Sequence, residues 1–251
     1  MTIIGITGGI GHGKSSLAEA FREIEPRSIH LETFAVISEV IEAWQARSDA
    51  VPNPHKLDAV NNWIQELPDV LRDIVHEIPA KESLRFDEED IARQPELYDK
   101  LFSYLQTAKK NPSLFHTRIT EANKAEFRPL LQWLGGYLVL RVDKGIWYQE
   151  LIRRSQTAAA DGTELSIISG VRFPTDAQII RDHGGYIVLI KRPLVGDQFV
   201  SDPTERERSK INPDTTILNN AGLTELEAVA RRVYTDISLG RLQNRYAATG
   251  E

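Results

Sequence analysis

The residues best suited to bind a ligand or take part in catalysis lie near the start of the chain, in the segment GITGGIGHGKSS at 5–16. This segment fits the pattern G-x-x-x-x-G-K-[ST], which ends here in Gly13, Lys14 and Ser15. Glycines let the backbone turn so that successive N–H groups face phosphate oxygens. Lys14 would reach the β- and γ-phosphates, and the hydroxyl of Ser15 would bind Mg²⁺. The pattern therefore predicts a site for ATP and Mg²⁺.

The residues expected to hold the nucleotide all come from this loop and the first helical turn after it. They are Gly8, Gly9, Gly11, His12, Gly13, Lys14, Ser15 and Ser16, with Ser15 also the expected metal ligand. The loop has the context that the pattern requires, because the apolar run at 2–7 predicts a buried strand and the residues from 14 to 24 repeat with helical spacing. A glycine-rich turn that binds nothing is the simpler alternative.

Two further features could act on the group that receives the phosphate. Glu32 follows the second expected strand, where a carboxylate could orient an incoming nucleophile or take a proton from it. A polar loop near 194–213 is expected to close over the nucleotide as a lid, with Arg206 stabilising charge in the transition state. Each feature also fits an ordinary solvent-exposed charged loop.

The elements that must position these residues alternate between strands and helices at both ends of the chain. Strand patterns at 2–7, 28–32, 164–171, 186–191 and 215–218 indicate a doubly wound α/β fold with a parallel sheet of about five strands. We expect the nucleotide-binding core at 1–45 and 161–251. Residues 46–160 are almost wholly helical in pattern, so we expect a large helical insertion after strand 2 that binds the acceptor.

Composition narrows the classes of function. Hydrophobic residues make up 41% and charged residues 26%, which is ordinary for a globular protein. The net charge of −6 argues against a nucleic-acid partner, and the absence of cysteine excludes thiol catalysis and disulfides. No apolar stretch approaches the roughly 20 residues that cross a bilayer, and no signal-peptide pattern opens the sequence. We therefore expect a cytoplasmic protein without a membrane partner, either a monomer or a homodimer.

Several segments resemble known kinase families. The opening stretch IIGITGGIGHGKSSLAEAF is similar to the start of dephospho-coenzyme A kinases. Later segments resemble phage-type deoxynucleoside monophosphate kinases: RPLLQWLGG, GIWYQEL, GVRFPTDAQIIRDHGGYIVLIKRP and DTTILNNAGLTELEAVARRV. This resemblance covers roughly residues 1–45 and 127–240. It implies a P-loop kinase fold, ATP with Mg²⁺ as donor, and a (deoxy)nucleoside monophosphate as acceptor.

The resemblance also implies roles for individual residues. Arg172 matches a catalytic, substrate-binding arginine of the family, and Glu32 falls where both families place an aspartate that contacts the acceptor. Arg128 and Gln132 match the arginine and glutamine on the acceptor side, while Arg141 lies one residue out of register with a third such position. In the last of these segments, Asn220 matches an asparagine at the nucleotide site.

The chain departs from the family pattern at positions that matter for the acceptor. Gly170 and Asp202 stand where the family has aspartate and histidine, and Asp176 replaces a glutamate. These departures leave two alternatives to a nucleoside monophosphate kinase. One is a dephospho-coenzyme A kinase, in which Glu32 would be a general base toward a ribose hydroxyl. The other is a nucleotide-binding protein with little catalysis.

Overall fold

The structure is a computed structural model that describes residues 1–75, 80–193 and 203–242. It contains two compact units. The first joins residues 1–33 to the chain from residue 148 onward, and the second comprises residues 34–147. The sequence pattern places the corresponding boundaries at 45/46 and 160/161. Among the described residues, no helix is long and apolar enough to cross a membrane.

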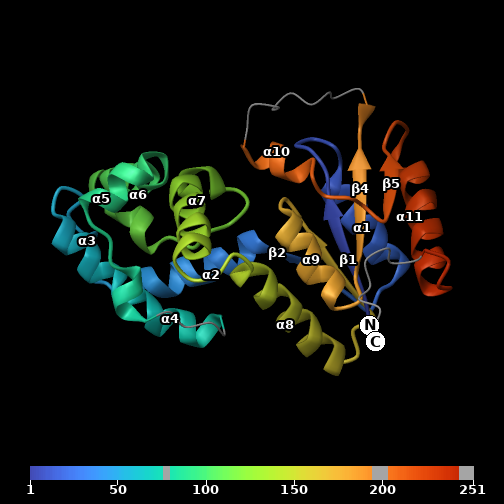
Figure 1. The fold of residues 1–251 in the computed structure, drawn as a ribbon, viewed down its shortest axis with the longest axis horizontal. Coiled ribbons are helices and arrows are strands. Elements are labelled where there is room, and N and C mark those ends of the chain that lie inside the picture. The colour runs from blue at the N-terminus through green and yellow to red at the C-terminus, as the bar shows by residue number, and fades with distance from the viewer. Residues whose placement is uncertain (76–79, 194–202, 243–251) are drawn as a thin grey trace. The chain divides into compact units, whose positions relative to one another are not determined.

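The first unit is built on a five-stranded parallel sheet (Figure 1). Its strands are β1 (Thr2–Thr7), β2 (Ser28–Glu32), β3 (Leu165–Ser169), β4 (Tyr186–Lys191) and β5 (Thr215–Leu218), in the order β2-β3-β1-β4-β5. Every neighbouring pair is parallel. The expected doubly wound α/β fold is confirmed. The order reverses at β1, so the loop after β1 lies where ligands bind in open sheets of this kind.

Helices cover both faces of the sheet because each strand alternates its side chains between them. Helices α1 (Lys14–Ile24) and α11 (Leu223–Ser238) share one apolar core with Ile4, Ile6 and Ile190. Helix α9 (Pro174–Asp182) covers the other face, where a Cβ on Gly5 would lie 2.7 Å from Cδ1 of Ile180. Helix α8 (Ile146–Ala160) bonds to that same face through its own Ser155, whose Oγ lies 2.6 Å from Oγ of Ser166 on β3.

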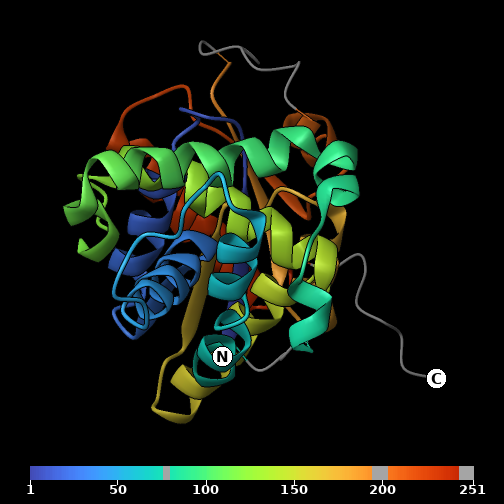
Figure 2. The same ribbon diagram turned by 90° about the vertical axis from the view of Figure 1, so that its left-hand side faces the viewer.

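The second unit is helical (Figure 2). Its elements are α2 (Thr33–Gln45, whose first residue belongs to the first unit), α3 (Leu57–Ile64), α4 (Leu67–Ile74), the 3₁₀ helix η1 (Lys81–Leu84), α5 (Glu88–Arg93), α6 (Pro95–Lys110), the 3₁₀ helix η2 (Pro112–His116) and α7 (Lys124–Arg141). Its core contains stacked aromatic rings: Trp44 stacks on Trp63 with ring centroids 3.6 Å apart, and Trp133 stacks on Tyr137 at 4.6 Å. These three tryptophans are buried.

Candidate nucleotide and acceptor site

The loop predicted to bind phosphate, called the phosphate loop below, connects β1 to α1 and requires glycine at several positions. Gly11 and Gly13 have φ of +78° and +101°, in the left-handed region that favours glycine. A Cβ at Gly8 would lie 2.5 Å from the carbonyl oxygen of Ile190, so the neighbouring strand β4 leaves no room for a side chain. Helix α1 then begins at Lys14, directly after the loop. The loop N–H groups and the N-terminus of α1 can therefore face the same anion.

Lys14 lies over this loop. Its Nζ donates hydrogen bonds of 2.9 Å to the carbonyl oxygens of Gly8 and Gly9. Ser15 and Ser16 follow in the first turn of α1 and are exposed. The arrangement fits a nucleoside triphosphate with Mg²⁺, because the exposed hydroxyl of Ser15 together with phosphate oxygens is a set of ligands that Mg²⁺ accepts.

His12 is a structural part of the loop. Its side chain is buried, and a Cβ at Gly9 would lie 2.8 Å from its Nε2, so the imidazole fills the space that a side chain at position 9 would need. Its Nδ1 is buried and has no hydrogen-bond partner among the described residues. Whether His12 contacts a nucleotide stays a prediction.

The sequence predicts Asn220 at the nucleotide site, but the residue hydrogen-bonded to the loop is its neighbour Asn219. Nδ2 of Asn219 donates a 3.0 Å hydrogen bond to the carbonyl oxygen of His12, and its backbone N–H donates to the carbonyl of Lys191 at 2.7 Å. Asn220 is exposed. The sequence indicates an asparagine at this site through the pair of adjacent asparagines. Only the position at which β5 ends shows which of the two amides points at the loop.

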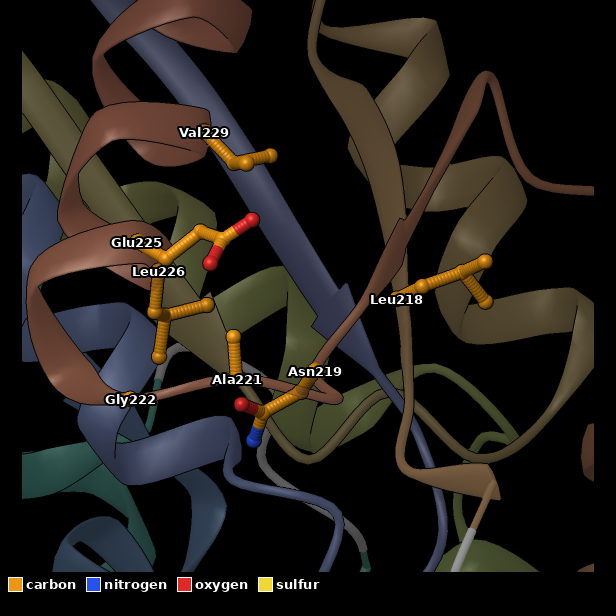
Figure 3. A pocket seen from close by; sticks show the side chains of 7 residues that line it. All are labelled: Leu218, Asn219, Ala221, Gly222, Glu225, Leu226 and Val229. Carbon is orange, nitrogen blue, oxygen red and sulfur yellow. The ribbon is translucent and has the colours of Figure 1, made fainter.

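A small pocket adjoins Asn219 (Figure 3). Asn219, Ala221 and Gly222 come from the segment between β5 and α11. Glu225 comes from α11, and the remaining lining residues are Leu218, Leu226 and Val229. The pocket therefore combines aliphatic walls with one carboxylate and one amide, beside the loop that would hold the phosphates.

A row of polar side chains lies at the carboxyl ends of the strands, the end of the sheet at which the phosphate loop also lies. Glu32 ends β2 and pairs in register with Ser169, which ends β3. Ser169 Oγ donates a hydrogen bond to Glu32 Oε1, and the Nε2 of His30 lies 2.8 Å from that Oγ. Since β3 lies between β2 and β1, Glu32 stands two strands from the phosphate loop, about 10 Å at the usual strand spacing.

The segment after β3 carries Arg172, another residue expected at the acceptor. Gly170 has φ of +87°, a conformation that an aspartate would adopt only with strain. Arg172 is exposed, and its backbone N–H and that of Phe173 donate to Oδ2 of Asp176 at 3.1 and 3.0 Å. Asp176 is buried at the start of α9, and that burial raises the pKa of its carboxyl to about 6, although the two N–H groups and Arg172 favour the ionised form.

Tyr148 is a residue that sequence reasoning missed. Its side chain is buried near the start of α8, and its hydroxyl has no hydrogen-bond partner among the described residues. Burial raises the pKa of this phenol well above its ordinary value, the negative charges of Asp176 and Glu32 raise it further, and Arg172 opposes them. A tyrosine within a helical stripe reads as core, so the sequence holds no signal for this placement.

The acceptor residues expected in the insertion lie on α7. Arg128 and Gln132 are four residues apart and exposed, so they share one face of the helix. Arg141 is engaged within the helical unit: its Nη2 lies 2.8 Å from Oδ2 of Asp90 and 3.3 Å from the hydroxyl of Tyr98. The expected contact of all three with an acceptor stays a prediction.

Part of the expected lid can be placed. Arg206 is exposed on α10 (Pro203–Arg208), where its carbonyl oxygen accepts a hydrogen bond from Ser209 Oγ at 2.7 Å. Residues 194–202, which include Asp202 and begin the lid segment, lie outside the described residues. A closing movement and a catalytic role for Arg206 stay predictions.

Comparison with known families identifies the chain. The sequence profile of the deoxynucleotide monophosphate kinase family matches residues 71–229, well over half of its length. The chain belongs to the deoxynucleotide monophosphate kinase family. The match includes Arg128, Gln132, Arg172 and Asn219 but not the phosphate loop, so the loop pattern is a separate observation. Membership supports a nucleotide kinase.

Individual relatives are viral and distant. The chain is 32% identical over 81 residues to a putative deoxynucleotide monophosphate kinase of Acanthamoeba polyphaga mimivirus, covering 32% of this chain and 38% of that protein. It is 28% identical over 132 residues to an uncharacterised protein, ORF76, of Ictalurid herpesvirus 1 (strain Auburn), covering 51% of this chain and 54% of the relative. The matched stretches thus span about half, or less, of these relatives.

Proposed function

We propose that this protein transfers the γ-phosphate of ATP to a deoxynucleoside monophosphate. The observation that carries the proposal is the phosphate loop, with Lys14 held over the glycines, in a chain whose residues 71–229 match the deoxynucleotide monophosphate kinase family. The loop supplies a donor site, and the family name supplies the class of acceptor. Mg²⁺ bound through Ser15 would neutralise charge on the β- and γ-phosphates.

The protein's own residues would act mainly by charge and position. Lys14 would turn from the loop carbonyls to the γ-phosphate and stabilise its charge as an oxygen of the acceptor phosphate attacks phosphorus and the bond to ADP breaks. Glu32 lies at the carboxyl end of β2, and the loop follows the carboxyl end of β1, so both lie at the same end of the sheet. Glu32 would orient the acceptor. Arg128 and Gln132 would bind the acceptor from α7, because a planar guanidinium can bond two phosphate oxygens at once.

The test is ATP consumption with Mg²⁺ in the presence of each deoxynucleoside monophosphate, each ribonucleoside monophosphate or dephospho-coenzyme A. We expect stimulation by one or more deoxynucleoside monophosphates. Lys14→Ala should abolish it, whereas Lys144→Ala, which changes an exposed lysine of the helical unit, should leave it unchanged. Stimulation by dephospho-coenzyme A alone would contradict the proposal, as would consumption of ATP that no acceptor changes.

A further inference from the structure

Two residues beside Glu32, His30 on the same strand and Ser169 on the neighbouring strand, can hold its carboxylate in position. We infer that His30 and Ser169 form a one-way hydrogen-bond relay that holds one oxygen of the Glu32 carboxylate and leaves the other for the acceptor. The inference rests on the proposed function for the identity of the acceptor, but the relay itself is a property of the protein alone.

The three side chains lie on one face of two adjacent strands. His30 and Glu32 are two residues apart on β2 and so point to the same side, and Glu32 pairs in register with Ser169. Nε2 of His30 lies 2.8 Å from Ser169 Oγ and 3.5 Å from Glu32 Oε1, while Ser169 Oγ donates to that same Oε1. Ser169 is buried, and the other two side chains are partly exposed.

The direction of the hydrogen bonds follows from counting protons. An ionised carboxylate only accepts hydrogen bonds, so the single hydroxyl proton of Ser169 goes to Glu32. The oxygen of Ser169 must then accept from His30, which places the proton of the neutral imidazole on Nε2. Both contacts meet at Oε1, and no hydrogen bond ends at Oε2 within the part of the chain that the structure describes. Oε2 can therefore accept from a donor group of the nucleotide.

Burial keeps the ring of His30 neutral near pH 7, and the charges around it act in both directions. Burial of the ring lowers the pKa of His30 below its ordinary value, and Glu32 opposes this shift. From α1, Arg22 lowers that pKa further and Glu19 raises it. In mild acid the protonated ring would lie 3.5 Å from the carboxylate and compete with the acceptor for it. The KM for the acceptor should therefore rise as the pH falls through the titration of His30, while the KM for ATP should not.

The first test observes the relay without any substrate. Nitrogen-15 chemical shifts of the imidazoles identify the His30 tautomer, with His30→Gln assigning the signal among the six histidines. We expect the Nε2–H tautomer at pH 7.5, its loss as the dominant form in Ser169→Ala, and a lower pKa of His30 in Glu32→Gln. An Nδ1–H tautomer, or a His30 signal that Ser169→Ala leaves unchanged, would overturn the relay whether or not the protein is a kinase.

The second test separates positioning from simple support of the fold. Ser169→Ala should raise the KM for the deoxynucleoside monophosphate about tenfold, since a hydrogen bond to a charged group is lost, with the KM for ATP within twofold. Ser166→Ala is the matched control, because Ser166 is a buried, hydrogen-bonded serine of the same strand whose side chain points to the opposite face. His30→Gln should flatten the acid rise of the acceptor KM. Equal effects of the two serine variants would overturn the positioning role.

Discussion

The side-chain amide of Asn219 donates a 3.0 Å hydrogen bond to the carbonyl oxygen of His12, across 207 residues of sequence. The same residue is bonded through its backbone to Lys191 at the end of β4. Asn219 therefore connects the middle of the phosphate loop to the ends of β4 and β5, the last two strands in the sheet order. A loop fixed in this way needs less ordering when a triphosphate binds, and preorganisation of that kind favours affinity.

Asn219→Ala should weaken ATP binding about three- to tenfold, which corresponds to the loss of one ordinary hydrogen bond. Asn220→Ala is the matched control, because Asn220 is the adjacent, exposed residue of the same type. Calorimetric titration of both variants with a non-hydrolysable ATP analogue and Mg²⁺ measures the effect. A larger loss of affinity in Asn220→Ala would show that the sequence-based choice of Asn220 was right and that Asn219 serves only the fold.

Asp176 should make the free energy of unfolding depend on pH. Its carboxyl has a pKa of about 6 in the folded protein against 3.8 in the unfolded chain, so the folded state binds the proton more tightly. This contribution is fully present below pH 3.8 and is lost as the pH rises through about 6. Asp176→Asn keeps an oxygen for the N–H groups of Arg172 and Phe173 but cannot titrate.

The measurement for Asp176 is denaturant unfolding of wild type and Asp176→Asn between pH 4 and pH 7.5. Relative to the variant, the wild type should lose on the order of 2–3 kcal/mol over this range, as expected for a shift of about two pKa units. Asp182→Asn changes an exposed carboxylate of the same helix and controls for general charge effects. Parallel pH profiles of wild type and Asp176→Asn would contradict the raised pKa.

Arg128 and Arg141 should respond differently to the same substitution. Arg128→Lys should weaken binding of the monophosphate by about 1–3 kcal/mol and spare ATP, because lysine cannot bond two phosphate oxygens in one plane. Arg141→Lys should instead lower the free energy of unfolding, since the guanidinium of Arg141 is already bonded to Asp90 and Tyr98. Calorimetry with ATP and with each monophosphate, together with denaturant unfolding, separates the two effects. Loss of ATP affinity in Arg128→Lys with unchanged monophosphate affinity would contradict its acceptor role.

The sequence predicts the fold because its signals are local. The apolar runs form β1, β3 and β4, of which β3 is buried throughout and the other two are buried in part. The glycine–lysine pattern lies between a strand and a helix, as expected. These features need no knowledge of which strand lies beside which.

The parts that the sequence does not predict depend on strand order and register. Ser169 reads as one more residue of a buried strand, and His30 as an isolated histidine; only the β2–β3 pairing places both against Glu32. The choice between Asn219 and Asn220 depends on where β5 ends. Tyr148 shares no sequence neighbourhood with the charges of Asp176, Arg172 and Glu32 that act on its phenol.

The proposed transfer of a phosphoryl group from ATP to a deoxynucleoside monophosphate can be observed directly. Phosphorus-31 NMR of a mixture of the protein, Mg²⁺, ATP and one deoxynucleoside monophosphate at a time observes that transfer directly. With at least one of the monophosphates we expect the signals of ATP and of the monophosphate to fall together, while signals of ADP and of the deoxynucleoside diphosphate rise in equal amounts. Release of inorganic phosphate from ATP with every monophosphate left intact, or no change with any of them, would contradict the account.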